Sequence, residues 1–456
     1  MELSILKNIS PIDGRYSDKV NELRAIFSEY GQFKYRIKIE INWLKKLSDT
    51  AEIKEVPIFY EDIQEFLNSI IDNFSENDAS YIKSIEKDIN HDVKAVEYFI
   101  KEKINDIPVL HNISEFIHFA CTSEDINNLS YALMLKTTIY EIIIPCWNQL
   151  IREIKNLAKI YRNIPLLSRT HGQPATPTTM GKEMANTVFR MQRQLNQLNK
   201  IQILGKINGA VGNYNAHIVA YPEVDWLKLS KEFVMSLGLT WNPYTTQIEP
   251  HDYISELFDC ITRFNNILID FNRDMWSYIS LNYFKQKIIL KEVGSSTMPH
   301  KVNPIDLENS EGNLGIANTM MKHMSNKLPI SRLQRDLTDS TVLRNMGVAF
   351  SYSVIAYKAT LKGISKLEIN KDCMMDDLNS NWVVLAEPIQ TIMRRYGIKK
   401  PYETLKNLVH KNNIDQSTIH QFIDKIDIPN KEKIRLKKLT PYNYIGYAIK
   451  LVDELD

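Results

Sequence analysis

The sequence predicts an all-α protein in which long central helices form a multi-helix bundle. Through the middle of the chain, apolar residues recur at alternating spacings of three and four, which is typical of helices packed along a seam. Strict alternation of polar and apolar residues is scarce, so strands can be only a minor part of the fold. Hydrophobic residues make up 44% and charged residues 24% of the 456-residue chain. These ordinary globular values argue against long disordered stretches.

Three mainly helical domains follow one another along the chain. Residues 1–111 form an N-terminal domain with mixed, short amphipathic patterns. Residues 112–364 carry the long-helix patterns and form the central bundle domain. Residues 365–456 form a charged C-terminal helical domain whose helices are interrupted by prolines, namely Pro388, Pro401, Pro429 and Pro441.

One apolar stripe of the central domain shows the spacing most clearly. Its members are Leu257, Ile261, Phe264, Leu268, Phe271, Met275 and Tyr278. We interpret the methionine and the aromatic residues in this stripe as core, because such a seam packs against other long helices. Several stripes of this kind also favour burial against identical helices in a closed homo-oligomer.

Charge, cysteines and the N-terminus narrow the class of protein. Lys and Arg total 56 and Asp and Glu total 55, so the net charge of +1 argues against nucleic acid or an anionic membrane as a partner. The four cysteines are far apart and include no C-x-x-C pair, which suits a reducing compartment. The first residues have no signal-peptide pattern, and no apolar run approaches ~18 residues. The expectation is a soluble, cytoplasmic protein.

Common catalytic motifs are missing from the sequence. It contains no G-x-G-x-x-G, no G-x-x-x-x-G-K-[ST], no G-x-S-x-G and no H-E-x-x-H. Hydride transfer on a Rossmann unit, P-loop phosphoryl transfer, α/β-hydrolase chemistry and zincin proteolysis therefore lose support.

Two polar stretches rich in glycine and proline interrupt the helical patterns. Residues 169–177 contain His171, whose imidazole can donate or accept a proton. Residues 294–304 read Gly-Ser-Ser-Thr-Met-Pro-His-Lys-Val-Asn-Pro, in which hydroxyls, Lys301 and Asn303 can surround an anion. The alternatives are a histidine that caps a helix and a surface linker, but the second string is too specific for an ordinary linker.

Segment 335–344 combines two arginines with a serine and a threonine. Guanidinium groups bind phosphate in a bidentate manner, and hydroxyls add donors, so the segment suits a phosphate group. Pairing of the two arginines with Asp336 and Asp339 is an alternative of about equal weight on this pattern alone.

The three polar strings together point to a family. Gly294–Pro304 resembles the signature loop of the fumarase/aspartase superfamily, whose members eliminate fumarate from succinyl compounds. Thr122–Asn127 and Arg169–Gln173 resemble its other two shared segments, in the same order. With Ser10–Tyr16 and Arg335–Arg344, nearly the whole chain is similar to the bacterial branch that acts on phosphorylated succinyl-purines.

The resemblance implies a chemistry and an assembly. A base removes a carbon-bound proton beside a carboxylate, an acid protonates the departing nitrogen, and no metal or other cofactor is required. The family further implies a homotetramer in which the segments that contain Thr122, His171 and Ser295 come from three different subunits to build each active site.

Residue roles follow from the same resemblance. It makes Ser295 the base and His171 the acid, with Lys301 and Asn303 stabilising the developing charge and Glu308 in support. The remaining substrate-binding residues that it implies are Arg15, Tyr16, Asn90, His91, Asp92, Thr122, Ser123, Gln247, Ser296, Val302, Asn309, Arg335, Ser340, Thr341 and Arg344.

Two alternatives stay open at this stage. A sister lyase that acts on argininosuccinate, fumarate or aspartate would share the three segments but would not need the arginines of segment 335–344. A non-enzymatic helical scaffold would need neither His171 nor Ser295 in its loops.

Overall fold

The computed structural model describes residues 5–289, 294, 296–409 and 414–455. Helices make up 64% and strands 5% of the structure, which confirms the prediction of an all-α fold. The chain forms two compact units. Unit 1 comprises Met1–Cys146, Gln194–Asn265 and Gly312–Ala356, and unit 2 comprises Trp147–Arg193, Asn266–Glu311 and Tyr357–Asp456.

Unit 1 contains mostly short and medium helices together with one pair of short strands. They are α1 (Asn21–Phe27), α2 (Glu29–Ser48), α3 (Glu61–Asp72), α4 (Glu76–Ile89), α5 (Asp92–Lys103), α6 (Pro108–His111), α7 (Ser123–Thr138), β3 (Leu204–Gly205), α10 (Asn215–Ala220), α11 (Trp226–Ser236), β4 (Thr240–Trp241) and α14 (Thr338–Leu343). The strands β3 and β4 pair in parallel.

Unit 2 contains two antiparallel strand pairs and the C-terminal helices. They are β1 (Pro165–Thr170), β2 (Gln173–Thr179), β5 (Phe284–Gln286), β6 (Leu367–Ile369), α16 (Lys371–Asn379), α17 (Ala386–Arg395), α18 (Pro401–Val409), α19 (Gln416–Lys425), α20 (Asn430–Lys437) and α21 (Ala448–Asp453). The remaining long helices are α8 (Ile144–Ile160), α9 (Met180–Leu198), α12 (Asp252–Ser280), α13 (Ile305–Lys327) and α15 (Met346–Ser365), each with residues in both units.

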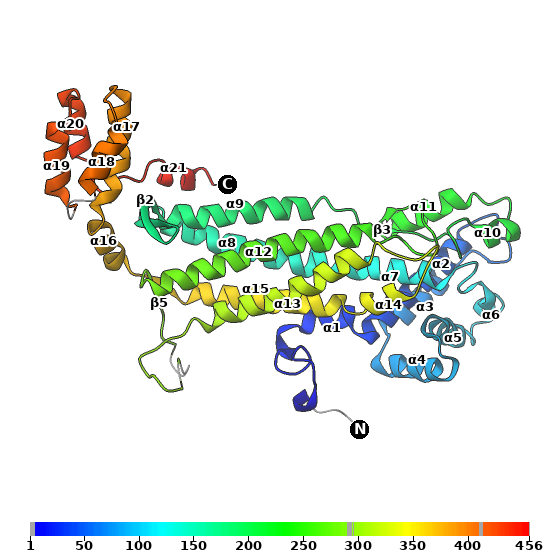
Figure 1. The fold of residues 1–456 in the computed structure, drawn as a ribbon. Coiled ribbons are helices and arrows are strands. Elements are labelled where there is room, and N and C mark those ends of the chain that lie inside the picture. Colours follow the sequence, from blue (N-terminus) through cyan, green and yellow to red (C-terminus); the bar gives the residue numbers. More distant parts are fainter. Residues whose placement is uncertain (1–4, 290–293, 295, 410–413, 456) are drawn as a thin grey trace. The chain divides into compact units, whose positions relative to one another are not determined.

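Helices α2 and α7 lie side by side in unit 1 (Figure 1). Helix α2 begins at a serine cap, because the Oγ of Ser28 accepts a hydrogen bond from the backbone N–H of Gly31 at 3.2 Å. Its partner α7 begins after Thr122, whose backbone N–H donates to the carboxylate of Asp125 at 2.9 Å. Both caps satisfy backbone donors that a helix end would otherwise leave free.

The first polar stretch forms a hairpin in unit 2. Strand β1 pairs antiparallel with β2, and Thr170 lies opposite Gln173, so His171 and Gly172 make a two-residue turn. Their φ angles are +52° and +73°, as the common hairpin turns require. The prediction that no helix continues here is confirmed, but the stretch is a hairpin and not a loop between helices. A two-stranded sheet leaves edge positions at which prolines such as Pro174 are tolerated.

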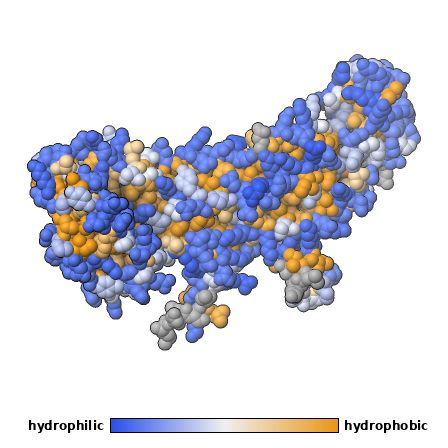
Figure 2. All heavy atoms as spheres, turned by 180° about the vertical axis from the view of Figure 1, so that it is seen from behind, coloured by the Kyte–Doolittle hydropathy of each residue, from blue (hydrophilic) through white to orange (hydrophobic). Residues whose placement is uncertain are grey.

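The apolar stripe predicted at residues 257–278 lies along α12. Leu257, Phe264 and Leu268 are at most 1% exposed within this single chain. The sequence analysis used stripes of this kind as a reason to expect an oligomer. This stripe is buried within one chain, so it needs no second copy of the chain. Other apolar side chains of the long helices do remain exposed, and the face drawn in Figure 2 carries hydrophobic areas among the hydrophilic ones.

The continuous helical stretch Ser123–Ile160 is apolar and long enough to cross a membrane by composition alone. However, 61% of its most apolar window is buried inside the protein. That degree of burial is typical of a core helix in a soluble protein.

Candidate active site

The start of α7 is held by a buried network of hydrogen bonds. The carboxylate of Asp125 is fully buried and accepts four hydrogen bonds. The donors are the Thr122 N–H and the Lys206 ammonium, both at 2.9 Å, and the N–H groups of Asn208 at 2.9 Å and Gly209 at 3.0 Å. The buried ion pair thus ties the segment that carries Thr122 to the loop after β3.

The guanidinium of Arg335 lies against the same segment. Its Nη2 donates to Oε1 of Glu124 at 3.1 Å, and its Nη1 donates to Oε1 of Gln247 at 3.1 Å. The Asp339 carboxylate is 4.0 Å from Nη2. The structure therefore brings together Arg335 and Gln247, which the sequence placed in the site, and fixes both beside the buried Glu124.

Arg344 is held by a second carboxylate, that of Asp92 at the start of α5. The Oδ2 of Asp92 accepts from Nη2 of Arg344 at 3.3 Å and from Nη2 of the buried Arg36 at 2.8 Å. Burial by itself would raise the pKa of Asp92, but the two guanidinium groups hold this pKa below its usual value. Asp92 is thus kept ionised between two cations.

The alternative pairing within segment 335–344 is present in part, because Nη2 of Arg335 lies 4.0 Å from Oδ1 of Asp339. Asp336 accepts hydrogen bonds from Arg332 and Thr338, while Arg335 and Arg344 turn to Glu124 and Asp92. Ser340 is half-buried, and the next residue, Thr341, is exposed. Arg344 also lines a pocket of about 260 Å³ between residues 12–28 and 344–351.

The other predicted residues of unit 1 occupy turns and helix ends. Arg15 is exposed and Tyr16 half-buried in the N-terminal segment. Asn90 adopts a left-handed conformation, with φ of +52°, where α4 ends. His91 caps α5, because its Nδ1 accepts from the N–H of Lys94 at 3.1 Å. Ser123, the first residue of α7, is half-buried.

His171 stands exposed at the tip of the hairpin in unit 2. Among the residues that the structure describes, its ring has no hydrogen-bond or ion-pair partner. The strands below the tip are anchored to the C-terminal helices: Arg169 donates to Asp377 at 2.5 Å, and Thr176 donates to Glu387. Figure 1 shows α16 beside this hairpin. The strands of the hairpin are thus fixed to the C-terminal helices, while the imidazole at its tip is exposed.

The second polar stretch, residues 294–304, also belongs to unit 2. Ser295 lies outside the described residues. A Cβ added to Gly294 would lie only 2.2 Å from the carbonyl oxygen of Lys301, so only glycine fits where the two ends of the stretch meet. Ser296 and Lys301 are exposed, whereas Val302 and Asn303 are half-buried.

Two predicted residues lie just beyond this stretch, on α13. Oε1 of Glu308 accepts from the indole N–H of Trp276 at 3.0 Å. The sequence analysis listed Glu308 as a supporting residue, and within the described part of the chain its support comes from an indole. Asn309 is half-buried one residue further on.

Sequence reasoning missed four side chains that organise unit 1. Glu124 and Asn127 belong to the family segment at the start of α7, but the resemblance pointed only to Thr122 and Ser123 there. Lys206 gave a usable signal, because a lysine inside the apolar run from Ile201 to Ile207 is unusual unless it is paired. Arg36 gave none, since charged residues are frequent throughout α2.

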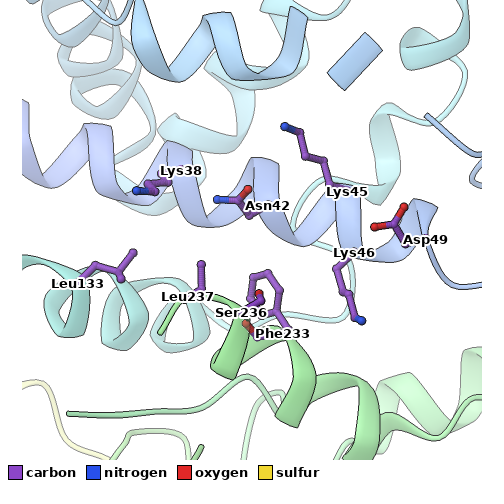
Figure 3. A pocket seen from close by; sticks show the side chains of 9 residues that line it. All are labelled: Lys38, Asn42, Lys45, Lys46, Asp49, Leu133, Phe233, Ser236 and Leu237. Atoms are coloured by element: carbon purple, nitrogen blue, oxygen red, sulfur yellow. Dashed lines mark hydrogen bonds between the residues drawn. The ribbon is translucent and has the colours of Figure 1, made fainter. Parts of the chain in front are cut away.

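A separate pocket of about 450 Å³ lies in unit 1 and contains none of the predicted site residues. Its lining residues are Lys38, Asn42, Lys45, Lys46, Asp49, Leu133, Phe233, Ser236 and Leu237. Figure 3 shows the side chains of Lys45 and Lys46 pointing in opposite directions. The first ammonium binds Asn68 at 2.5 Å and the second binds Glu232 at 2.8 Å. Two of the lysines that line this pocket are therefore paired with neighbouring side chains.

Comparison with known proteins decides the family. The family described as "Lyase" matches residues 14–318, and the family "Adenylosuccinate lyase C-terminal" matches residues 331–445. The chain is 67% identical over 455 residues to the adenylosuccinate lyase of Escherichia coli K12, with 100% of both chains covered. The chain belongs to the adenylosuccinate lyase family. Other curated adenylosuccinate lyases include those of Haemophilus influenzae, at 64% identity, and Buchnera aphidicola subsp. Schizaphis graminum, at 60%, each with 100% of both chains covered.

Solved structures extend the likeness at the level of the fold. A fumarate lyase from Mesorhizobium sp. BNC1 matches with a TM-score of 0.76 at 16% identity, covering 96% of this chain and 97% of that one. The beta-carboxy-cis,cis-muconate cycloisomerase of Acinetobacter calcoaceticus sp. ADP1 matches with a TM-score of 0.73 at 14% identity, covering 97% and 99%. The chain thus shares its helical fold with a fumarate lyase and a cycloisomerase.

Proposed function

We propose that this chain is a carbon–nitrogen lyase that cleaves adenylosuccinate to AMP and fumarate. The same site would release fumarate from SAICAR, the succinylaminoimidazole carboxamide ribotide, to give AICAR. The observation that carries the proposal is the full-length similarity to curated adenylosuccinate lyases, which includes a C-terminal match that begins at residue 331 and contains Arg335 and Arg344. A sister lyase without a phosphorylated substrate has no need of those arginines.

The reaction defines a role for each polar loop. Ser295 takes the proton from the carbon next to a carboxylate of the succinyl group, and negative charge accumulates on that carboxylate. The carbon–nitrogen bond then breaks, fumarate forms, and His171 protonates the departing nitrogen. Lys301 and Asn303 stabilise the charged carboxylate, since fixed donors are effective where charge develops. The proposal uses no metal and no other cofactor.

Recognition of the nucleotide falls to unit 1. Arg335 and Arg344 bind the phosphate, with Ser340 and Thr341 as further donors, because arginine forks match phosphate oxygens. Thr122, Ser123, Gln247 and the segments around Arg15 and His91 contact the rest of the substrate.

The working enzyme is a homotetramer in the cytoplasm, in which three subunits contribute to each site. Support comes from exposed apolar side chains on the long helices: Phe189 is 60%, Trp276 47% and Ile316 46% exposed in the single chain. Large apolar groups left open on long helices favour burial against further copies of the chain.

The test is to incubate the purified protein with adenylosuccinate and to follow the absorbance change together with the fumarate formed. Argininosuccinate, aspartate and malate serve as comparison substrates for the sister lyases. We expect fumarate from adenylosuccinate and none from the other three. Fumarate from a comparison substrate but not from adenylosuccinate would overturn the proposal.

A further inference from the structure

A single buried guanidinium, that of Arg36 on α2, links the two arginines that we assign to the phosphate. Its side chain is 2% exposed. Its Nη2 donates to Oδ2 of Asp92 at 2.8 Å, and its Nε donates to Oδ1 of Asn127 at 2.9 Å. Each of these two acceptors is also linked to one of the phosphate arginines. Asp92 binds Arg344 directly, and Asn127 is linked to Arg335 through Glu124.

The first branch runs through Asp92. Its Oδ2, which accepts from Arg36, also accepts from Nη2 of Arg344 at 3.3 Å. Arg344 is 46% exposed on its side chain and would otherwise sample many rotamers. A shared, ionised carboxylate between a buried and an exposed guanidinium therefore gives Arg344 a defined position.

The second branch runs through Asn127. Since its Oδ1 accepts from Arg36, its Nδ2 must face the other way, and it donates to Oε1 of Glu124 at 2.8 Å. That same oxygen accepts from Nη2 of Arg335 at 3.1 Å. Arg36 thus sets the orientation of the Asn127 amide, and the amide sets the position of the carboxylate that holds Arg335.

We propose that Arg36 is a positioning residue for a phosphomonoester, because it fixes Arg335 and Arg344 together through Asn127 and Asp92. This inference rests on the proposed function and extends it to a residue that does not touch the substrate itself. The role requires arginine, because a planar fork serves two acceptors in fixed directions whereas a lysine ammonium is a point charge on a flexible chain.

The test compares Arg36→Lys with the parent on adenylosuccinate and on the dephosphorylated nucleoside. The substitution keeps the charge beside Asp92 and removes the fixed contact with Asn127. We expect kcat/KM for adenylosuccinate to fall by roughly 10- to 100-fold, the range for one lost charge-assisted hydrogen bond, mainly through KM. The value for the nucleoside should change by less than about 3-fold, because it has no phosphate to place.

A matched control removes a different bond between α2 and α7. Tyr35 donates its hydroxyl to Thr137 at 3.1 Å and lies outside the network, so Tyr35→Phe should leave the ratio between the two substrates at the parent value. If Arg36→Lys leaves the ratio between the two substrates at the parent value, the inference is overturned. This holds whether both values of kcat/KM fall equally, which would mean a merely structural role, or neither falls.

Two further measurements keep the outcome decisive. If Arg36→Lys does not fold, Asn127→Asp replaces it: the new carboxylate still accepts from Arg36 but repels Glu124, and the same selective loss is expected. If the parent cleaves neither substrate, the proposed function fails, and calorimetric binding of inorganic phosphate then decides about Arg36. Weaker binding in Arg36→Lys supports the inference, while equal binding, or no binding by the parent, overturns it.

Discussion

The two units handle their polar residues in opposite ways. In unit 1, Asp125, Glu124 and Asp92 are each held by at least two donors, and several of these partners are buried. In unit 2, His171, Ser296 and Lys301 are exposed on a hairpin tip and a loop. The comparison indicates that a single chain orders the residues that we propose for nucleotide binding, whereas the groups that we propose for the chemistry are exposed.

This difference has a physical reason. A phosphate is recognised by fixed guanidinium forks, and fixing them requires counter-charges and buried hydrogen bonds. A proton donor must instead reach the substrate and must stay free of competing partners. A hydrogen-bond network that already fixes the guanidinium groups before the substrate arrives suits binding. Exposed side chains on firmly anchored segments suit proton transfer.

The largest expected effect comes from the two residues that we propose as acid and base. His171→Ala and Ser295→Ala should each lower kcat by about 10²–10⁴-fold, the usual contribution of one general acid or base. Truncating His171 removes few packing contacts, so the melting temperature should stay near that of the parent. His171→Asn is the control for the turn, because asparagine also adopts positive φ. Near-parent turnover in either alanine variant would refute the role assigned to that residue.

The second prediction contrasts one lysine from each unit. Lys206→Met leaves the Asp125 carboxylate buried without its cation, and the free energy of unfolding should fall by about 3–5 kcal/mol. Lys301→Met removes an exposed lysine and should change it by less than about 0.5 kcal/mol while lowering turnover. Urea denaturation of both variants measures the difference. If both variants lost a similar amount of unfolding free energy, the proposed difference between the two units would be wrong.

The third prediction concerns the phosphate. Arg335→Ala should weaken the use of adenylosuccinate by roughly 10- to 100-fold, equivalent to ~1.5–3 kcal/mol, with a much smaller effect on its dephosphorylated nucleoside. Arg332→Ala, in the same segment, removes a guanidinium whose side chain is 79% exposed and should leave both rates unchanged. If Arg335→Ala discriminates between the two substrates as well as the parent, Arg335 does not bind the phosphate.

The smallest effect is a pH dependence confined to unit 1. Burial lowers the pKa of His217 from 6.5 to about 4, and its ring packs 4.8 Å from that of Trp226. The unfolded chain therefore binds more protons between these two values, so stability is complete above about pH 6.5 and is lost as the pH falls toward 4.

The measurement for this prediction is urea denaturation at pH 7 and pH 5. His217 should account for about 2 kcal/mol of the stability lost between them. His217→Phe should lose that much less over the same interval. An equal loss in the parent and the variant would show that His217 is not the group responsible.

The sequence could predict features that depend on residues close together along the chain, but not contacts between residues far apart in the sequence. The stripe on α12 was visible because its spacing is local, and the polar strings were visible because each is continuous. The hairpin around His171 was not predicted, since its strands are short and contain prolines. The link from Arg36 to Asn127 joins positions 91 residues apart, and no local pattern reports such a contact. The supporting network of the site is therefore a property of the folded chain.

The central claim is that one working site takes His171 and Ser295 from different subunits. The most direct test dissociates the inactive His171→Ala and Ser295→Ala proteins, mixes their subunits in equal amounts and reassembles them, with each variant reassembled alone as the control. Random mixing gives about one quarter of the sites neither substitution, so roughly a quarter of the parent lyase activity should return. If hybrids confirmed by mass remain inactive, both residues serve the same site from the same chain, and the account is contradicted.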